Sequence, residues 1–349
     1  MGIKNILICT SQVPLRYGGT EVLVQCLRQA LLKHGFQVDV VSIPFRYYPK
    51  SEILKSHLVW RLLDLTESDG QKVDMVIATK FPSYLVQHPN KVTWLVQQFR
   101  QVYDLIGTEF SPFTNSKEDT ALRRVIGRLD TVALKESKRL FAISDNVAKR
   151  LERYNGLRAI PLYPPPQHEG LYRNDDYGDY ILAVSRLNRL KRLDLLVQAM
   201  ALVKQPARCL IVGEGPEEER LKSLIRERKL GDRVKLLGFI GDQQLLDLYA
   251  NCFAFFFAPY DEDYGLVTVE AFKSQKPVIT AGDSGGVLEF VEHDRNGYIA
   301  ATGSAAEFAE YIERLYANRA LCQKLGQAGY DRVRDITWDH TIDQLLGLQ

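Results

Sequence analysis

The chain has few of the residues that build disulfide-stabilised or metal-binding proteins. Its 349 residues include five dispersed cysteines, an odd number without a CxxC pair. This pattern argues against a disulfide framework and favours buried free thiols. The six histidines have no HExxH or comparable spacing. We therefore expect no metal site and no resident cofactor.

Long apolar runs are also missing. No stretch approaches the roughly 20 apolar residues of a membrane-spanning helix, and the first residues predict a short strand instead of a signal peptide. Hydrophobic residues make up 46% of the chain and charged residues 25%, as in an ordinary folded protein. We expect a cytoplasmic protein of two domains without a nucleic-acid partner.

Charge is divided unevenly along the chain. Residues 1–165 contain 23 Lys and Arg against 15 Asp and Glu, a net of +8, whereas the remainder has 22 against 28, a net of −6. The basic half suits an anionic partner, either a phosphate-bearing acceptor or peripheral contact with the inner membrane face. An ordinary solvated charge distribution is the alternative.

One stretch of the basic half, residues 44–61, suits such a membrane-facing or acceptor-facing surface. It mixes basic with aromatic side chains, namely Arg46, Tyr47, Tyr48, Lys50, Lys55, Trp60 and Arg61. A loop and helix packed on the domain would explain the same residues equally well.

Alternating strand and helix patterns predict the fold class. Apolar residues 3–9, a helical pattern over 21–33 and a strand pattern over 36–41 form a β-α-β unit, which implies a parallel sheet. A proline-rich stretch, 163–170, interrupts the alternation, which resumes at residue 180. We therefore predict an α/β protein of two tandem Rossmann-like, doubly wound domains with a cleft between them.

The predicted boundaries follow from these patterns. Residues 1–165 form the acceptor-side domain, 166–177 a linker and 178–335 the donor-side domain. Residues 336–349 form a short helix, which either packs on its own domain or crosses back to the first.

Two basic residues, Arg186 and Lys191, follow the predicted strand 180–184. A planar guanidinium and a compact ammonium group suit two adjacent phosphates. Because Arg189 and Arg192 are nearby, a solvated basic patch is the alternative.

Glycine-containing turns follow the next two strands. Gly213 begins a Gly-Glu-Gly-Pro turn into a helix, and Phe239 and Ile240 lie between two glycines. The first turn suits a phosphate and the second a base held against apolar surface. Ordinary structural turns are the alternative for both, since the full GxGxxG fingerprint is absent.

Glu262 and Glu270 are eight residues apart, the first predicted on a loop after strand 252–257 and the second within helix 267–272. An unpaired Glu270 among core residues would be costly to bury, so we interpret it as a ligand of ribose hydroxyls. The alternative is an exposed or helix-capping Glu270. Between the two glutamates, the helix N-terminus would offer an anion the backbone N–H groups of Gly265, Leu266 and Val267.

A glycine pair in the first half, Gly18 and Gly19, precedes a predicted helix at the carboxyl end of the first strand. Glycines there let a ligand approach the backbone, and a helix N-terminus favours an anion. A plain loop is the alternative.

These motifs, in this order, resemble those of the retaining glycosyltransferases of family four, also called glycosyl transferases group 1, which have the GT-B fold. The resemblance spans essentially the whole chain and is strongest over residues 185–297. Each motif is weak alone, but their joint order is specific.

The resemblance implies a binding site for a nucleoside diphosphate sugar. Arg186 and Lys191 would bind the diphosphate and Glu262 the sugar, which makes these three the expected catalytic residues. Glu270 would hold the ribose. Such enzymes generally need no divalent metal for the transfer. The remaining expected donor contacts are Gly18, Gly19, Gly213, Phe239, Ile240, Gly265, Leu266 and Val267.

One position departs from the family pattern. Many relatives have a histidine after a first-domain strand near the donor sugar, where this chain has Gln97 and Gln98. Glutamine donates a hydrogen bond to a sugar hydroxyl but carries no proton at neutral pH. Either Gln97 or Gln98 positions the sugar, or activity is altered or lost.

We therefore expect a hexosyltransferase that moves a sugar, with retention, to a saccharide or lipid-linked acceptor in polysaccharide or glycolipid assembly. The family is usually described by a same-face internal return mechanism, which makes Glu262 a positioning residue instead of a nucleophile. The alternative is a catalytically weak sugar-nucleotide-binding or scaffold protein of the same fold. A nicotinamide dehydrogenase is disfavoured, because neither half has a GxGxxG turn with a downstream acid.

Overall fold

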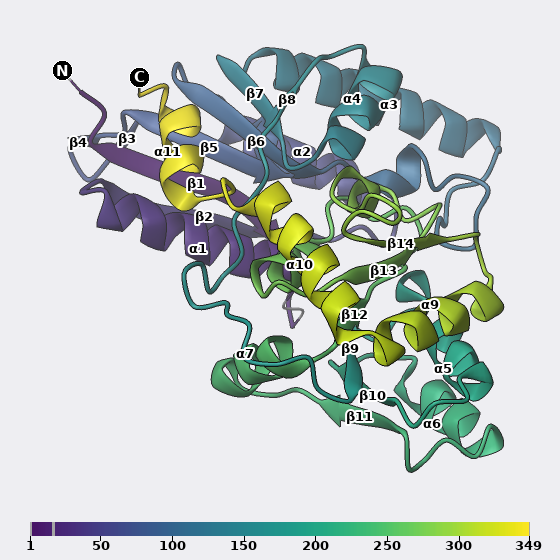
Figure 1. The fold of residues 1–349 in the computed structure, drawn as a ribbon. Coiled ribbons are helices and arrows are strands. Elements are labelled where there is room, and N and C mark those ends of the chain that lie inside the picture. The colour runs from purple at the N-terminus through teal and green to yellow at the C-terminus, as the bar shows by residue number, and fades with distance from the viewer. Residues whose placement is uncertain (1, 16–17, 349) are drawn as a thin grey trace. The chain divides into compact units, whose positions relative to one another are not determined.

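The computed structural model describes residues 2–15 and 18–348, and the chain divides into two α/β units. Unit 1 consists of residues 1–167 and 337–349, and unit 2 of residues 168–336. Each unit has a six-stranded sheet in which every pairing between strands is parallel, with helices packed around it (Figure 1). This arrangement confirms the predicted pair of Rossmann-like α/β folds.

In unit 1 the chain first builds the sheet outward in one direction and then continues it on the other side. The first two strands are neighbours, and the third strand of the sheet pairs with the free side of the first. The spatial order is β2 (Gln37–Pro44), β1 (Asn5–Gln12), β5 (Met75–Lys80), β6 (Lys91–Gln97), β7 (Arg139–Ala142) and β8 (Ile160–Pro161).

The helices of unit 1 connect these parallel strands, as parallel pairing requires. They are α1 (Gly19–Lys33), α2 (Glu52–Leu62), α3 (Lys117–Lys135) and α4 (Asp145–Asn155), with the short 3₁₀ turns η1 (Ser83–Leu85) and η2 (Arg100–Val102) and the two-residue strands β3 (Glu67–Ser68) and β4 (Gln71–Lys72).

The C-terminal helix α11 (Trp338–Leu346) belongs to unit 1. The indole of Trp338 packs edge-on against buried Trp94, with 6.3 Å between ring centroids. Arg139 donates a hydrogen bond to the Gln344 carbonyl oxygen at 3.3 Å. The sequence left open whether this helix packs on its own domain or on the first, and the structure shows that it packs on the first.

In unit 2 the change of direction lies between β9 and β12. The order is β11 (Val234–Gly238), β10 (Arg208–Val212), β9 (Tyr180–Val184), β12 (Ala254–Phe256), β13 (Val278–Ala281) and β14 (Gly297–Ala300). In doubly wound sheets, ligands bind at such a change of direction, outside the carboxyl ends of the strands.

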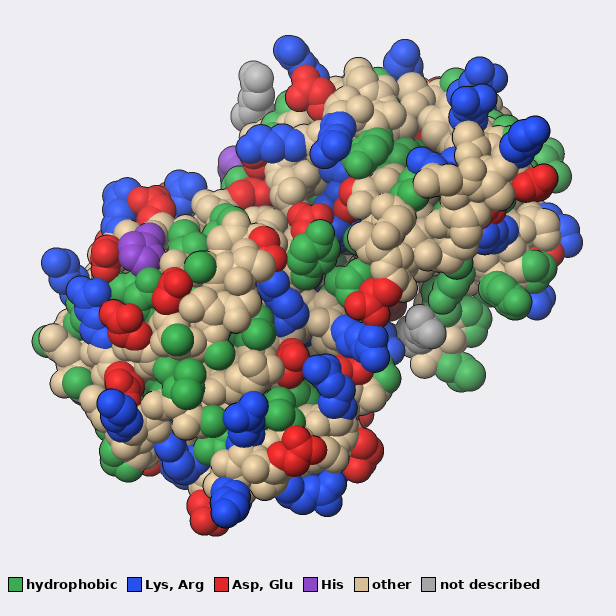
Figure 2. All heavy atoms as spheres, turned by 90° about the vertical axis from the view of Figure 1, so that its right-hand side faces the viewer, with side chains coloured by type: hydrophobic (Ala, Val, Ile, Leu, Met, Phe, Trp, Pro, Cys, Tyr) green, Lys and Arg blue, Asp and Glu red, His purple; other side chains and the backbone are tan. Residues whose placement is uncertain are grey.

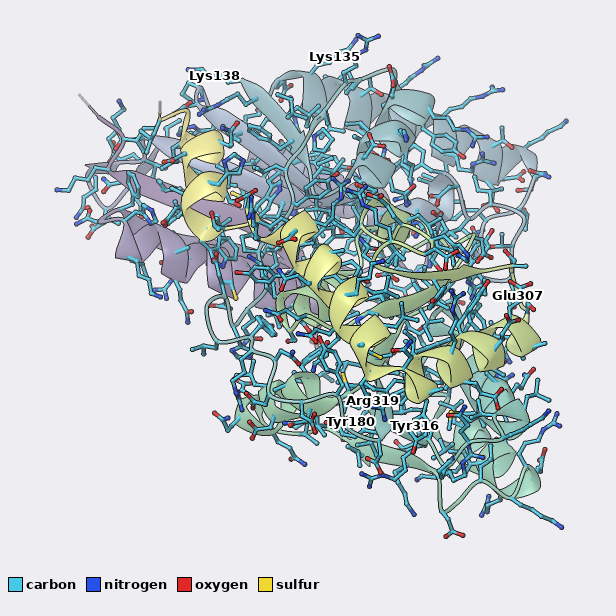
Figure 3. All side chains as sticks on the ribbon, in the orientation of Figure 1. Lys135, Lys138, Tyr180, Glu307, Tyr316 and Arg319 are labelled. Carbon is cyan, nitrogen blue, oxygen red and sulfur yellow. The ribbon has the colours of Figure 1, made fainter. Side chains whose placement is uncertain are left out.

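Six helices pack around this second sheet. They are α5 (Leu193–Leu202), α6 (Glu218–Glu227), α7 (Asp242–Asn251), α8 (Leu266–Lys273), α9 (Ala305–Ala317) and α10 (Arg319–Val333), joined by the 3₁₀ turns η3 (Arg189–Lys191) and η4 (Gly286–Glu289). At the α9–α10 junction, the guanidinium of Arg319 lies 4.7 Å from the ring centroid of Tyr316 and 5.0 Å from that of Phe253 (Figure 3).

Two glycines let α10 approach α8 closely. A Cβ atom at Gly329 would overlap the ring of Phe272, and one at Gly326 would overlap the carbonyl oxygen of Gln275. Glycine lowers helix propensity by about 1 kcal/mol relative to alanine, so this contact explains two unfavourable residues inside α10. Because α8 also carries Glu270, the close packing holds that residue at a fixed depth.

The difference in net charge is smaller between the two observed units than between residues 1–165 and the remainder of the chain. Unit 1, with its C-terminal helix, has 23 Lys and Arg against 17 Asp and Glu, a net of +6, and unit 2 has 22 against 26, a net of −4. On the face drawn in Figure 2, basic and acidic side chains are interspersed. No helix in the described part of the chain is long and apolar enough to cross a bilayer.

We expect the docking of α11 to stabilise unit 1. Leu345 is fully buried, so Leu345→Ala should lower the free energy of unfolding by about 2–5 kcal/mol, measured by urea denaturation. Leu348, two residues beyond α11, is 48% exposed, and Leu348→Ala should change the stability by less than about 0.5 kcal/mol. Equal losses in both variants would contradict the placement of α11.

Candidate functional site

The candidate site of unit 2 lies where the loops after β9 and β12 meet. The ammonium group of Lys191, from the first loop, lies 2.5 Å from Oε2 of Glu262, on the second. These residues are 71 positions apart in the sequence, and the switch in strand order brings them together. Two of the three predicted catalytic residues are thus direct neighbours.

The Lys191–Glu262 pair is partly withdrawn from water. The two side chains are 18% and 24% exposed, and the Lys191 ammonium lies 5.1 Å from the ring centroid of Phe257. The backbone of η3 is fixed by Asn188, whose side-chain oxygen accepts a hydrogen bond from the Lys191 N–H at 3.2 Å. A cation held in this way is available to an anionic ligand that competes with Glu262.

Arg186, the third predicted catalytic residue, has a different environment. Its side chain is exposed, and the described residues offer its guanidinium no ion pair or hydrogen-bond acceptor. Of the four cations in the β9 loop, Arg189, Lys191 and Arg192 each pair with a carboxylate, whereas Arg186 has no such partner among the described residues. An anion such as a diphosphate would supply the missing charge.

Gly213 positions this basic loop. Its φ of +126° favours glycine, and a Cβ atom there would overlap the carbonyl oxygen of Ser185. The Ser185 N–H donates to the Val212 carbonyl oxygen at 3.0 Å, and the Leu187 N–H donates to that of Glu214 at 2.9 Å. The glycine turn therefore has a structural role, because it holds the backbone on either side of Arg186.

A second clamp holds the Glu262 loop. Gly285 has a φ of +61°, and a Cβ atom there would lie 2.5 Å from the carbonyl oxygen of Glu262. The Gly286 N–H donates to the same oxygen at 2.8 Å. The turn 283–286 therefore packs directly against the backbone that carries the Glu262 carboxylate.

Arg192 completes this clamp, a role that the sequence did not indicate. Its guanidinium forms a bidentate ion pair with Asp283 at 2.6 and 2.8 Å and donates to the carbonyl oxygens of Ala258 and Pro259. Arg192 also has a positive φ of 49°. It is a structural residue of the site, whereas its neighbour Lys191 faces the carboxylate of Glu262.

Helix α8 begins at this edge without a side-chain cap. Its N-cap, Gly265, has a φ of +82°, and a Cβ atom there would lie 2.8 Å from Val287 Cγ2. The first residues, Leu266 and Val267, are partly exposed. The first N–H groups of a helix have no intrahelical acceptor, so this terminus suits an anion.

Glu270 lies one turn into α8 and is only 8% exposed, which rules out the exposed alternative. Its carboxylate already has a partner within the protein, because the Tyr249 hydroxyl donates a hydrogen bond to Oε2 at 2.8 Å. Burial raises the pKa of Glu270 to about 7, and hydrogen bonds from Tyr249 and Tyr172 partly oppose this increase. No sequence pattern indicated these tyrosines, which lie in other segments of the chain.

Phe239 and Ile240 lie after β11. Phe239 is 81% exposed, an unusual state for a large apolar ring, and Ile240 is half-buried. Gly238, with a φ of +67°, turns the chain into this loop. The ring is accessible to a planar ligand.

In unit 1, the glycine pair begins α1 but does not present an open helix end. The carboxylate of Glu21 accepts a hydrogen bond from the Gly18 N–H at 2.9 Å, and Gly19 is the first helical residue. The other oxygen of Glu21 pairs with Lys80 at 2.7 Å. The predicted anion site at Gly18 and Gly19 therefore contains the protein's own carboxylate, which the capping position of Glu21 could have indicated.

The two glutamines of unit 1 differ in accessibility. Gln98 is 1% exposed and donates to the side-chain oxygen of Asn155 at 2.5 Å. Gln97, the last residue of β6, is exposed and lies in register with Lys80 at the end of β5. The sugar-positioning hypothesis therefore narrows to Gln97.

Three of the four Lys and Arg residues in the stretch 44–61 form ion pairs. Lys50 pairs with Asp119 at 2.7 Å, Arg61 with Glu136 at 2.7 Å and Lys55 with Glu52 at 2.7 Å. Trp60 is 1% exposed. Arg46 is exposed and donates to the Tyr48 carbonyl oxygen at 2.9 Å. The three ion pairs and the buried Trp60 favour the alternative interpretation, a loop and helix packed on the domain.

Comparisons with known proteins agree with this geometry. Residues 172–332 match the family model described as glycosyl transferases group 1. The alpha-1,3/1,6-mannosyltransferase ALG2 of Homo sapiens is 29% identical over 171 residues, 44% of this chain and 41% of that protein. The D-inositol 3-phosphate glycosyltransferase of Nocardia farcinica is 27% identical over 384 residues, 99% of this chain and 84% of that protein. The chain thus spans less than half the length of the mannosyltransferase.

A solved structure extends the similarity to the whole fold. HepE from Anabaena, in complex with UDP and glucose, superposes with a TM-score of 0.72 at 19% identity over 99% of this chain and 98% of that chain. At this identity the likeness shows a shared GT-B architecture.

The burial of Glu270 predicts a pH-dependent stability. Its pKa is raised on folding, so its contribution to stability is complete at low pH and is lost as the pH rises toward 7. Glu270→Gln should therefore stabilise the protein relative to wild type by about 2 kcal/mol more at pH 8 than at pH 5, measured by urea unfolding. Glu227→Gln, at an exposed position of α6, is the control. The same stability difference at both pH values would contradict a raised pKa.

Proposed function

We propose that this chain, whose residues 172–332 match the family model of glycosyl transferases group 1, transfers a hexose-type sugar from a nucleoside diphosphate sugar to a saccharide or lipid-linked acceptor. The observation that carries the proposal is the arrangement at the carboxyl ends of β9 and β12. There the uncompensated Arg186, the Lys191–Glu262 pair and the uncapped start of α8 come from adjoining loops.

Each part of the donor would contact a different set of these residues. Arg186, Lys191 and the N–H groups of α8 would bind the diphosphate, and Glu270 would accept hydrogen bonds from the ribose hydroxyls. The base would lie against Phe239, with Ile240 beside it. HepE, which has the same fold, was solved with UDP and glucose, which favours a uridine donor as the first one to test.

The reaction breaks the bond between the anomeric carbon and the diphosphate oxygen and forms a bond to an acceptor hydroxyl. The acceptor loses a proton, and the leaving diphosphate gains negative charge that a proton can neutralise. Arg186 and Lys191 would stabilise that charge as it develops. We propose retention by a same-face internal return, in which the leaving phosphate oxygen takes the acceptor proton without a divalent metal.

Glu262 is proposed as a positioning residue for the sugar. Binding of the diphosphate at Lys191 would release the carboxylate to accept hydrogen bonds from sugar hydroxyls. Gln97, the exposed glutamine at the end of β6, is also proposed as a sugar-positioning residue.

The specific observation for the alternative function is in unit 1. Glu21 already accepts from the Gly18 N–H, and the buried Gln98 cannot take the place of the usual histidine. Both features suit a protein of this family that binds sugar nucleotides and turns them over slowly or not at all.

We expect turnover with one class of donor. Purified protein should release free nucleotide from one member of a panel of UDP-, GDP- and ADP-sugars in the presence of a saccharide or lipid-linked acceptor. The released nucleotide is measured by a coupled assay, with an EDTA-treated sample to test the proposed independence from metal. Binding of a donor without release across a broad acceptor set would favour the alternative, and absence of donor binding would contradict both.

Arg186 should contribute directly to donor binding. Removal of a charge-assisted hydrogen bond typically costs about 1.5–3 kcal/mol, so Arg186→Gln should weaken UDP-sugar binding roughly 10- to 100-fold and also lower kcat. Arg228→Gln is the matched control, since Arg228 is an exposed arginine at the C-terminal end of α6. Isothermal titration calorimetry measures the affinity of both variants for the UDP-sugar. An unchanged affinity in Arg186→Gln would exclude the guanidinium from the donor site.

A further inference from the structure

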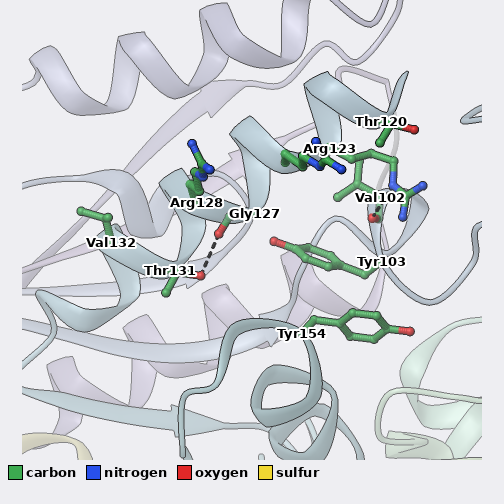
Figure 4. Close-up of a pocket in the computed structure, with 10 residues that line it drawn as sticks. Val102, Tyr103, Thr120, Arg123, Gly127, Arg128, Thr131, Val132 and Tyr154 are labelled. Atoms are coloured by element: carbon green, nitrogen blue, oxygen red, sulfur yellow. Dashed lines mark hydrogen bonds between the residues drawn. The ribbon is translucent and has the colours of Figure 1, made fainter. Parts of the chain in front are cut away.

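A pocket of about 660 Å³ lies in unit 1, and none of the residues that line it has been given a role above (Figure 4). Helix α3 forms one side with Arg123, Arg124 and Arg128, and the rings of Tyr103 and Tyr154 form the other. Its size falls in the range of small-molecule sites, about 300–1,000 Å³. Its lining combines cations with aromatic faces.

The arginines of the pocket lack anionic partners in the described part of the chain. No ion pair involves Arg123, Arg124 or Arg128, and the one hydrogen bond from this group runs from Arg123 Nε to the Val102 carbonyl oxygen at 3.3 Å. Arg124 and Arg128 are four residues apart on one helix, a spacing at which like charges destabilise the helix. An anion in the pocket would remove this repulsion.

The aromatic wall is rigid before any ligand arrives. The Tyr103 hydroxyl donates a hydrogen bond to the buried carboxylate of Asp130 at 2.5 Å. The Tyr154 ring packs against Tyr103 with 5.5 Å between centroids, and the guanidinium of Arg153 lies 5.3 Å from the Tyr154 centroid. Fixed rings offer an apolar surface without a further loss of side-chain entropy.

A glycine in the wall of the pocket, Gly127, is not required by packing within the protein. It lies in the middle of α3 and lines the pocket, where glycine is less favourable than alanine. A Cβ atom at this position would meet only the Tyr103 hydroxyl, at 4.0 Å, so packing does not require glycine. The absent side chain instead keeps the pocket open between the arginines and the tyrosines.

We propose that this pocket binds an acidic oligosaccharide, with its carboxylate groups on the arginines and its sugar rings against the tyrosines. Guanidinium groups match carboxylates in a planar, bidentate geometry, and aromatic rings suit the apolar faces of sugars. The inference rests on the proposed function, because a saccharide acceptor is the ligand that such an enzyme encounters. A bilayer is less well matched, since the arginines line a hollow instead of a protruding surface.

The pocket can be altered in shape and in charge separately. Gly127→Leu fills the pocket, keeps all the charges and introduces a better helix former. Arg124→Gln with Arg128→Gln removes two charges and keeps the shape. Lys117→Gln with Lys135→Gln is the matched control, because these lysines are exposed on the same helix but do not line the pocket.

The test is titration of the full chain with hexagalacturonate, with maltohexaose as the neutral saccharide. Wild type should bind hexagalacturonate and not maltohexaose. Gly127→Leu and the double arginine variant should each bind at least 10-fold more weakly, and the double lysine variant within twofold of wild type. UDP titration on every variant should give the wild-type affinity, which shows that unit 2 is intact.

Three results would overturn the proposal. Equal losses in the lysine and arginine variants would show attraction to diffuse charge, and failure of wild type to bind hexagalacturonate would remove the ligand class. Sedimentation of the protein with vesicles containing phosphatidylglycerol, lost in the arginine variant while hexagalacturonate does not bind, would assign this surface to a membrane. Failure of wild type to bind any donor would sink the proposed function, and the saccharide titration would report on the pocket separately.

Discussion

The ion pair between Lys191 and Glu262 joins the two loops on which the candidate donor site depends. Parallel strands can be adjacent in a sheet and distant in sequence, and the reversal of strand order between β9 and β12 makes these two loops neighbours. A pair of opposite charges then fixes their separation without blocking the site, because a partly exposed ion pair is weak enough for an anion to displace. Arg192 and the turn 283–286 hold the backbone while that exchange takes place.

Glu270, in contrast to the partly exposed Lys191–Glu262 pair, is buried away from water, which lowers the stability of the fold. Its carboxylate is buried in α8, Tyr249 satisfies one oxygen, and α10 packs on the same helix through two glycines. A protein keeps an energetically unfavourable group of this kind where a bound ligand recovers the loss. In the proposed function the ribose hydroxyls provide that compensation.

Unit 1 contains basic side chains that are paired with acids and others that are not, a difference that composition does not reveal. In the stretch 44–61, Lys50, Lys55 and Arg61 form ion pairs with Asp119, Glu52 and Glu136, whereas Arg46 donates only to a backbone carbonyl oxygen. The arginines of α3 that line the pocket have no such partners and surround a hollow with an aromatic wall. A net positive charge therefore says less about binding than the positions of the nearest acids.

The sequence by itself determined the α/β class, most strand positions and the set of donor-site candidates. Strand and helix periodicities and glycine turns are local signals, and they identified β9–β13 and the segments around Arg186, Glu262 and Glu270. It did not indicate α9, α10 or β14. For α10 the reason is physical, because interior glycines lower local helix propensity and their benefit comes from contact with α8.

Only the tertiary structure decided which partner each predicted site residue has and how exposed its side chain is. It paired Lys191 with Glu262 and left Arg186 uncompensated, gave Glu270 a tyrosine partner, buried Gln98 and exposed Gln97. It also returned the C-terminal helix to the first unit. These outcomes depend on contacts between residues up to about 200 positions apart, as between Arg139 and Gln344. A periodic pattern reports which face of an element is apolar, but it carries no information about which distant side chain lies opposite.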